Sequence, residues 1–152
     1  MGPSASILLS FEIESIYQSA IESLIDSLSE QRVKKDFWIK EKPFLLDFGW
    51  QYDTECEEYE DLQFLIGWSP KDQVILAAGC NQGIDHTILC DLCIALADRF
   101  HGYIDFGTYL NVFTNDDRLL SHPGHISYYD SSILSSELML MWCKHKDFRM
   151  VK

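Results

Sequence analysis

Residues 74–106 read VILAAGCNQGIDHTILCDLCIALADRFHGYIDF and predict a strand, a helix and a second strand in direct succession. The first six residues are a continuous apolar run of strand length, typical of a central strand buried on both faces. A helix is expected over residues 85–101, because apolar side chains recur there every three or four positions. Gly102 then occupies the position of a C-terminal glycine cap, and residues 103–106 predict the next strand. The inner face of the helix is expected to comprise Ile88, Leu89, Leu92, Cys93, Leu96 and Phe100.

The flanking sequence extends this pattern in both directions. Residues 4–11 are rich in β-forming side chains and predict a first strand, and residues 12–31 predict an amphipathic helix. The inner face of that helix is expected to comprise Ile13, Ile16, Tyr17, Ala20, Leu24 and Leu28. Further expected elements are short strands at 37–40 and 44–48, a helix at 134–145 and a strand at 148–151. We therefore expect one α+β domain over residues 1–152, a sandwich with helices packed on a mostly antiparallel sheet. It would have a ferredoxin-like core with an acidic helical insertion and a C-terminal extension.

The net charge of the chain limits the kinds of molecule that it is expected to bind. Acidic residues outnumber basic ones by 24 to 12, which gives a net charge of −12 and an isoelectric point near 4.6. Such a surface disfavours nucleic acid and anionic membranes, which reward clustered Lys and Arg, and favours a basic protein. The five cysteines are an odd number, and neither a secretory signal nor a long apolar run is evident. We therefore expect a cytoplasmic protein with free thiols that forms a monomer or a weak dimer, since −12 on each copy opposes self-association.

Residues 43–70 hold seven carboxylates and no Lys or Arg, so like charges repel without compensation. One interpretation is a solvated helix over residues 54–66, capped by Thr54 and ended by Gly67, with Tyr59, Leu62 and Ile66 on its inner face. The other is a binding surface for a cationic partner, because carboxylates pair with Arg and Lys while aromatic rings supply contact area. The candidate partner-binding residues are Asp53, Glu55, Glu57, Glu58, Glu60, Asp61, Trp50, Tyr52 and Tyr59.

A second hypothesis is a small enzyme or metal-binding domain centred on His86, Cys90 and Asp105. Cys90-x-x-Cys93, together with His86, has ligand types that zinc accepts, and His86 near Asp105 would suit acid–base chemistry. Cys93, however, falls on the apolar stripe of its helix, which favours plain core cysteines. His122, His125 and His145 lack the spacing of helical metal pairs. We expect no catalytic residue, no metal and no cofactor.

Residues 85–107 and 142–152 also resemble a family of small acidic bacterial proteins. The shared pattern is a helix opened by histidine that runs into Gly-x-Ile-Asp-Phe-Gly, with a terminal aromatic-basic-aliphatic-Val-Lys tail. The matching positions are His86, Gly102, Ile104, Asp105, Phe106, Gly107, Phe148, Arg149, Val151 and Lys152. Several related families are immunity proteins of polymorphic-toxin or contact-dependent inhibition systems. The resemblance implies a non-enzymatic bacterial binder of a cognate toxin domain, and a basic nuclease is the favoured target because nucleases need basic clefts.

Overall fold

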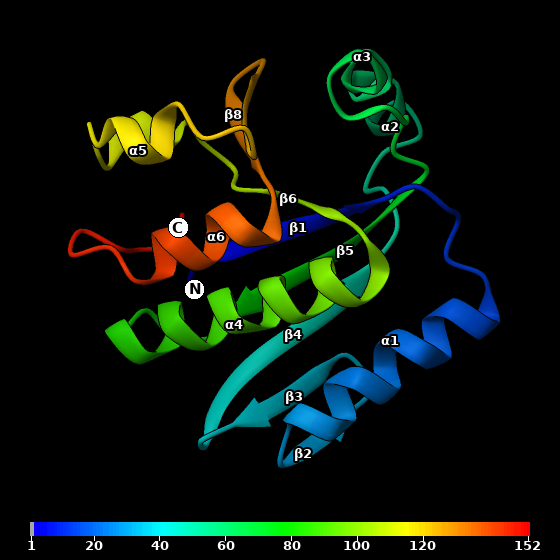
Figure 1. The fold of residues 1–152 in the computed structure, drawn as a ribbon. Helices are drawn as coiled ribbons and strands as arrows, with labels where there is room; N and C mark the ends of the chain where they lie inside the picture. Colours follow the sequence, from blue (N-terminus) through cyan, green and yellow to red (C-terminus); the bar gives the residue numbers. More distant parts are fainter. Residues whose placement is uncertain (1) are drawn as a thin grey trace.

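In the computed structural model, which describes residues 2–152, eight strands form one open antiparallel sheet in the order β2-β3-β4-β5-β1-β6-β8-β7 (Figure 1). The strands are β1 (Ser4–Leu9), β2 (Gln31–Val33), β3 (Asp36–Ile39), β4 (Lys42–Phe48), β5 (Asp72–Ala78), β6 (Tyr103–Asp105), β7 (His125–Tyr128) and β8 (Ser131–Leu134). The α-helices are α1 (Ser15–Leu28), α2 (Glu55–Glu58), α3 (Gln63–Ile66), α4 (Gly83–Phe100), α5 (Asp117–Leu120) and α6 (Ser136–Cys143). Two 3₁₀ turns, η1 (Glu60–Leu62) and η2 (Leu110–Val112), complete the list.

The centre of the sheet has the expected ferredoxin-like arrangement. The succession β1-α1-β4-β5-α4-β6 is a βαββαβ unit, and its first and third strands, β1 and β5, lie side by side in the middle. Ile7 on β1 pairs with Val74 on β5 and with Ile104 on β6, both in antiparallel register. Helices α1, α4 and α6 lie on one face of the sheet (Figure 1). The α+β expectation is thus confirmed.

Side chains alternate across β1, so the sheet has two distinct apolar layers. Ile7 and Leu9 are fully buried in the main core beneath the helices. Leu8 is fully buried in a smaller cluster with Leu62 and Ile133, on the opposite face. We call this opposite face the back face. The chain between β4 and β5, which contains the carboxylate-rich residues 53–61, packs against this face through Trp50, Leu62 and Trp68.

The prediction for the first helix was right in kind and only partly right in its inner face, where Ile13, Ala20 and Leu24 pack against the core as expected. Helix α1 runs from Ser15 to Leu28, and its buried residues are Ile21 and Ile25. Ile16, expected inside, is 74% exposed. The sequence has apolar residues on more than one side of this helix, so spacing alone does not say which stripe meets the sheet.

The central strand also differs from expectation. Val74, Leu76 and Ala78 are buried beneath the helices, whereas Ile75 is half-buried because the back face is only partly covered. At the end of α4, His101 rather than Gly102 adopts the left-handed conformation, with φ 55°. Gly102 is needed for close packing instead, since a Cβ atom there would lie 2.7 Å from the Leu8 carbonyl oxygen.

The C-terminal third contains elements that the sequence did not predict. Strands β7 and β8 form a hairpin beside β6. Near the N-terminus, β2 is also an unpredicted strand, at the opposite edge of the sheet. The expected strand at residues 148–151 is absent, although the Val151 carbonyl accepts a hydrogen bond from Ser4 N at 3.0 Å. None of the helices within residues 2–152 has the length and apolar character needed to cross a bilayer.

Candidate functional site

Residues 51–67, here called the acidic insertion, fold as three short turns on the back face. The expected single helix is divided into α2, η1 and α3, and Thr54 makes no capping hydrogen bond through its side chain. The predicted inner face is confirmed. Leu62 is fully buried, and Tyr59 and Ile66 pack against the cluster that contains Leu8. Gly67 ends the segment in the left-handed conformation, with φ 87°.

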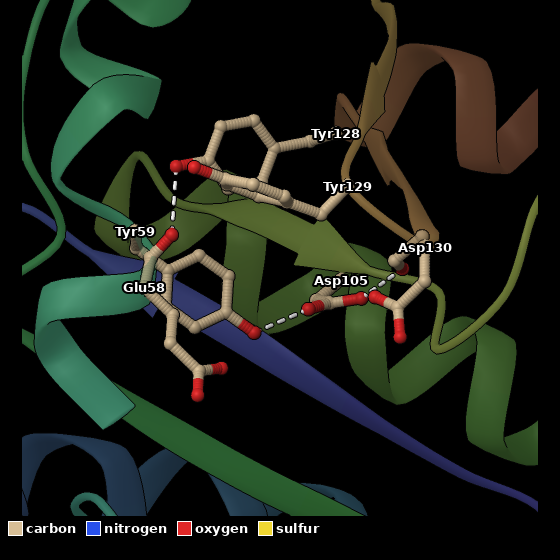
Figure 2. Close-up of a pocket in the computed structure, with 7 residues that line it drawn as sticks. Glu58, Tyr59, Asp105, Tyr128, Tyr129 and Asp130 are labelled. Carbon is tan, nitrogen blue, oxygen red and sulfur yellow. Dashed lines mark hydrogen bonds between the residues drawn. The ribbon is translucent and has the colours of Figure 1, made fainter. Parts of the chain in front are cut away.

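Tyr59 anchors the acidic insertion to the sheet. Its hydroxyl group donates a hydrogen bond of 2.5 Å to Oδ2 of Asp105, at the end of β6 (Figure 2). Its ring stacks on Trp50 and Tyr128, with centroid distances of 5.5 and 6.1 Å. Burial, and then the charge of Asp105, raise the pKa of Tyr59. The phenol therefore stays protonated and continues to donate at any physiological pH.

Replacement of Tyr59 by phenylalanine is expected to lower the free energy of unfolding by about 1.5–3 kcal/mol, because the lost hydrogen bond ends on a charged group. Chemical denaturation would measure the loss, and hydrogen exchange would show it concentrated in the acidic insertion. Tyr52→Phe is the matched control, since the Tyr52 side chain is 71% exposed. Equal stability of the two variants would contradict the anchoring role.

Five of the six predicted carboxylates lie in solvent. Glu55 is the exception, because its Oε2 accepts from the Gln51 backbone N–H at 2.6 Å and its Oε1 from the Gln73 side chain at 3.2 Å. Within residues 2–152, no Lys, Arg or His nitrogen lies within 4.0 Å of any of the six. Their mutual repulsion is therefore not relieved inside the protein. The exposed carboxylates are Asp53, Glu57, Glu58, Glu60 and Asp61.

The predicted aromatic residues divide into two groups. Tyr52 projects into solvent, whereas Trp50 and Tyr59 are half-buried and pack against each other. Two apolar side chains outside the predicted set are prominent on the acidic insertion, Phe64 at 79% and Leu65 at 57% exposure. A helix with Tyr59, Leu62 and Ile66 on its inner face already turns Phe64 and Leu65 away from the sheet, so the sequence could have indicated both.

A cavity of about 620 Å³ opens between the acidic insertion and the β7–β8 hairpin (Figure 2). Its lining combines apolar surface with tyrosine hydroxyl groups and carboxylates, and Tyr128 donates a 2.8 Å hydrogen bond to the Glu58 backbone carbonyl. The sequence pointed to Glu58 and Tyr59 but not to the hairpin residues, because the hairpin itself was not predicted. The lining residues are Glu58, Tyr59, Asp105, Tyr128, Tyr129, Asp130 and Ser131.

His86, Cys90 and Asp105 are not brought together into one site. His86 Nδ1 accepts from the Met150 backbone N–H at 2.8 Å, so Nε2 carries the proton and donates to Asn81 at 2.9 Å. Cys90 is buried between α4 and α6, and Asp105 holds the acidic insertion on the back face. In the part of the chain that the structure describes, no three His, Cys, Asp or Glu side chains converge to hold a metal ion.

The burial of Cys90 and Cys93 predicts that their thiols react slowly in the folded protein. Burial raises the pKa of Cys90, and it raises that of Cys93 to about 12. We expect both thiols to resist an aromatic disulfide reagent at about pH 8, because the thiolate is the reactive form. All five cysteines should react after unfolding. Rapid labelling of Cys90 in the folded protein, or stoichiometric zinc in the purified protein, would contradict a purely structural role.

His125 and Ser132 form a further pair that resembles catalytic machinery. His125 Nε2 lies 2.8 Å from the Ser132 hydroxyl group, and its Nδ1 lies 2.8 Å from the Leu120 carbonyl. Ser132 is fully buried, however, and its oxygen already accepts from the Leu110 backbone N–H at 2.9 Å. A nucleophile must be accessible to its substrate, and Ser132 is not. The pair therefore has a structural role, because its hydrogen bonds connect the β7–β8 hairpin to Leu110 and Leu120.

Comparison with known proteins assigns the chain to a family but not to an activity. A search of curated proteins found no match, and a search of solved structures found none either. One family model matches residues 1–152, from the first residue to the last. The chain therefore belongs to the family described as "Family of unknown function (DUF6368)".

Proposed function

We propose that this protein is an immunity protein that binds and neutralises the toxic domain of a cognate bacterial effector. One observation carries the proposal. The acidic insertion exposes five carboxylates that form no ion pair within residues 2–152, and the same segment exposes Tyr52, Phe64 and Leu65. Aromatic side chains are enriched in protein interfaces, and charged residues belong to their polar rim.

The charge on the acidic insertion is easier to explain with a partner than without one. Unrelieved repulsion between carboxylates works against the folded state. A basic partner would relieve that repulsion and would be drawn toward the surface by long-range attraction. The exposed aromatic and leucine side chains would then supply the desolvated contact that gives such interfaces most of their binding energy.

A basic nuclease is the favoured target. A nuclease binds phosphates in a cleft lined with Lys and Arg, and a surface of carboxylates can occupy that cleft in place of the substrate. The protein's own charge of −12 disfavours direct contact with nucleic acid. In this account it acts in the bacterial cytoplasm, as a monomer or a weak dimer, and performs no catalysis. The resemblance of residues 85–107 and 142–152 to relatives of immunity proteins points the same way.

Affinity capture from the native bacterium tests the proposal. The tagged protein should retain one basic effector domain at low salt and release most of it at about 0.5 M salt, where the Debye length falls to roughly 4 Å. The retained domain should be identified by mass spectrometry and then purified, so that binding is measured between two defined proteins. An acidic partner, or none, would contradict the proposal.

A further inference from the structure

The cavity between the acidic insertion and the β7–β8 hairpin has the chemistry of a receptor for an organic cation. Three of its lining residues are carboxylates, Glu58, Asp105 and Asp130, and the structure pairs none of them with a Lys, Arg or His in residues 2–152. Three others are tyrosines. Negative charge beside aromatic rings is the lining that attracts guanidinium and ammonium groups.

Asp105 lies where it can bind such a cation. It is half-buried, and its carboxylate accepts from the Tyr59 hydroxyl group at 2.5 Å, the Gly107 backbone N–H at 2.9 Å and the Ser131 hydroxyl group. A carboxylate offers about four acceptor positions, so one remains for a ligand. The three donors also fix its orientation, so little freedom would be lost when a ligand binds.

The tyrosines supply the aromatic part of the site. Tyr128 is held by its hydrogen bond to Glu58, and burial raises the pKa of Tyr128, which keeps the phenol neutral. Tyr129 is 68% exposed and packs edge-on against Tyr128, with centroids 4.7 Å apart. Its backbone has φ 50°, a conformation that glycine or asparagine adopts far more readily in a hairpin turn. The turn thus holds a large ring at the mouth of the cavity despite local strain.

The separation of the carboxylates in the cavity favours one kind of cation over others. A metal ion needs several ligands at one point, and among residues 2–152 no three His, Cys, Asp or Glu side chains converge in that way. A guanidinium group suits separated acceptors better, because it is planar, stacks on aromatic rings and has five donors directed outward. An ammonium group is more strongly hydrated and binds as a point charge.

We propose that this cavity receives an arginine side chain of the protein partner, between Tyr129 and the carboxylates of Asp105 and Asp130. This inference rests on the proposed function, which supplies the partner protein. In it, the bound arginine is the central contact of the interface. The surrounding carboxylates of the acidic insertion then serve mainly for attraction and orientation.

Titration of the ¹⁵N-labelled full chain with arginine amide tests the site without any partner protein. The Gly107 and Ser131 amide signals should shift, because both residues hydrogen-bond Asp105. A ligand of this size should bind with a dissociation constant on the order of millimolar. Lysine amide should bind more weakly, and citrulline amide, which has the same shape without the charge, should cause no shift at these positions.

Paired variants locate the binding. Asp105→Asn should weaken arginine amide about tenfold or more, through loss of a charge-assisted hydrogen bond. Tyr129→Asn should weaken it roughly two- to fivefold, and asparagine suits the positive φ, so the hairpin is retained. The exposed Tyr17→Asn change, in α1 on the helix side of the sheet, is the matched control and should have no effect.

Shifts that are absent, that occur equally with citrulline amide, or that give the wild-type dissociation constant in both cavity variants would overturn the assignment. A dissociation constant below about 10 µM for the free amide would identify a small molecule as the occupant and would also overturn it. Since the titration needs no partner, its failure would leave a salt-sensitive complex with a basic effector intact, and failure of that complex would leave the titration result unchanged.

Discussion

Exchange of Asp53, Glu57 and Glu60 for lysine is expected to weaken binding of the basic partner by at least about 100-fold. Each change replaces attraction by repulsion, and like charges across an interface cost several kcal/mol. The three side chains are exposed and make no hydrogen bond or ion pair in the described chain, so the variant should fold at least as well as the wild type. Biolayer interferometry at low salt would measure the loss, which should lie partly in the association rate.

A charge-matched variant separates local contacts from net charge. Asp36, Glu41 and Asp91 are also exposed carboxylates without ion pairs, and Asp91 lies beside Lys40 on the helix side of the sheet. Their exchange for lysine changes the net charge by the same amount. This control should keep nearly the full affinity. If both triple variants lost affinity equally, attraction would depend on overall charge and the acidic insertion would have no special role.

Replacement of Trp142 by alanine is expected to lower the free energy of unfolding by about 3–5 kcal/mol. Trp142 is fully buried on α6, and its indole N–H donates to the Arg149 carbonyl at 3.0 Å. Its ring packs against Phe106, Phe113 and Phe148, with centroids between 5.9 and 6.5 Å away. Truncation therefore leaves a large cavity, and the melting temperature should fall on the order of 10 °C in calorimetry.

Two comparisons make this second prediction specific. Trp38→Ala, in β3 next to the edge strand β2, should cost clearly less, because the Trp38 side chain is only half-buried. Well below its melting temperature, Trp142→Ala should also bind the partner with wild-type affinity, since Trp142 belongs to the core on the helix side of the sheet. A variant that is stable but fails to bind would place the interface on that side instead.

The sequence predicts the fold best where one apolar stripe is unambiguous. All six residues predicted for the inner face of α4 are buried, together with Cys90 and Ala97, and polar side chains such as Asp91, Asp98 and Arg99 lie on the exposed side. Helix α1 has apolar residues on several sides, so the choice of Ile21 and Ile25 is made by the sheet and not by local spacing. Gly102 shows the same dependence on tertiary contacts, because its small size is required by Leu8, far away in sequence.

The candidate site is predictable in its charge but not in its shape. The acidic insertion stands out in the sequence because no Lys or Arg occurs in it. Its division into short turns depends on packing of Tyr59 and Leu62 against the sheet. The cavity depends further on the β7–β8 hairpin, whose turn at Tyr129 lacks the Asn-Gly or Asp-Gly signal that usually reveals such hairpins.

Protection of growing cells tests the central claim most directly. Bacteria would express the captured effector domain from an inducible promoter, together with the wild-type protein, the Asp53/Glu57/Glu60 lysine variant or the Asp36/Glu41/Asp91 lysine variant. Colony counts after induction are the measurement. Wild type and the charge-matched control should restore growth, and the variant of the acidic insertion should not. Equal protection by all three proteins, or no protection by the wild type, would contradict the proposal that the acidic insertion neutralises a toxic partner.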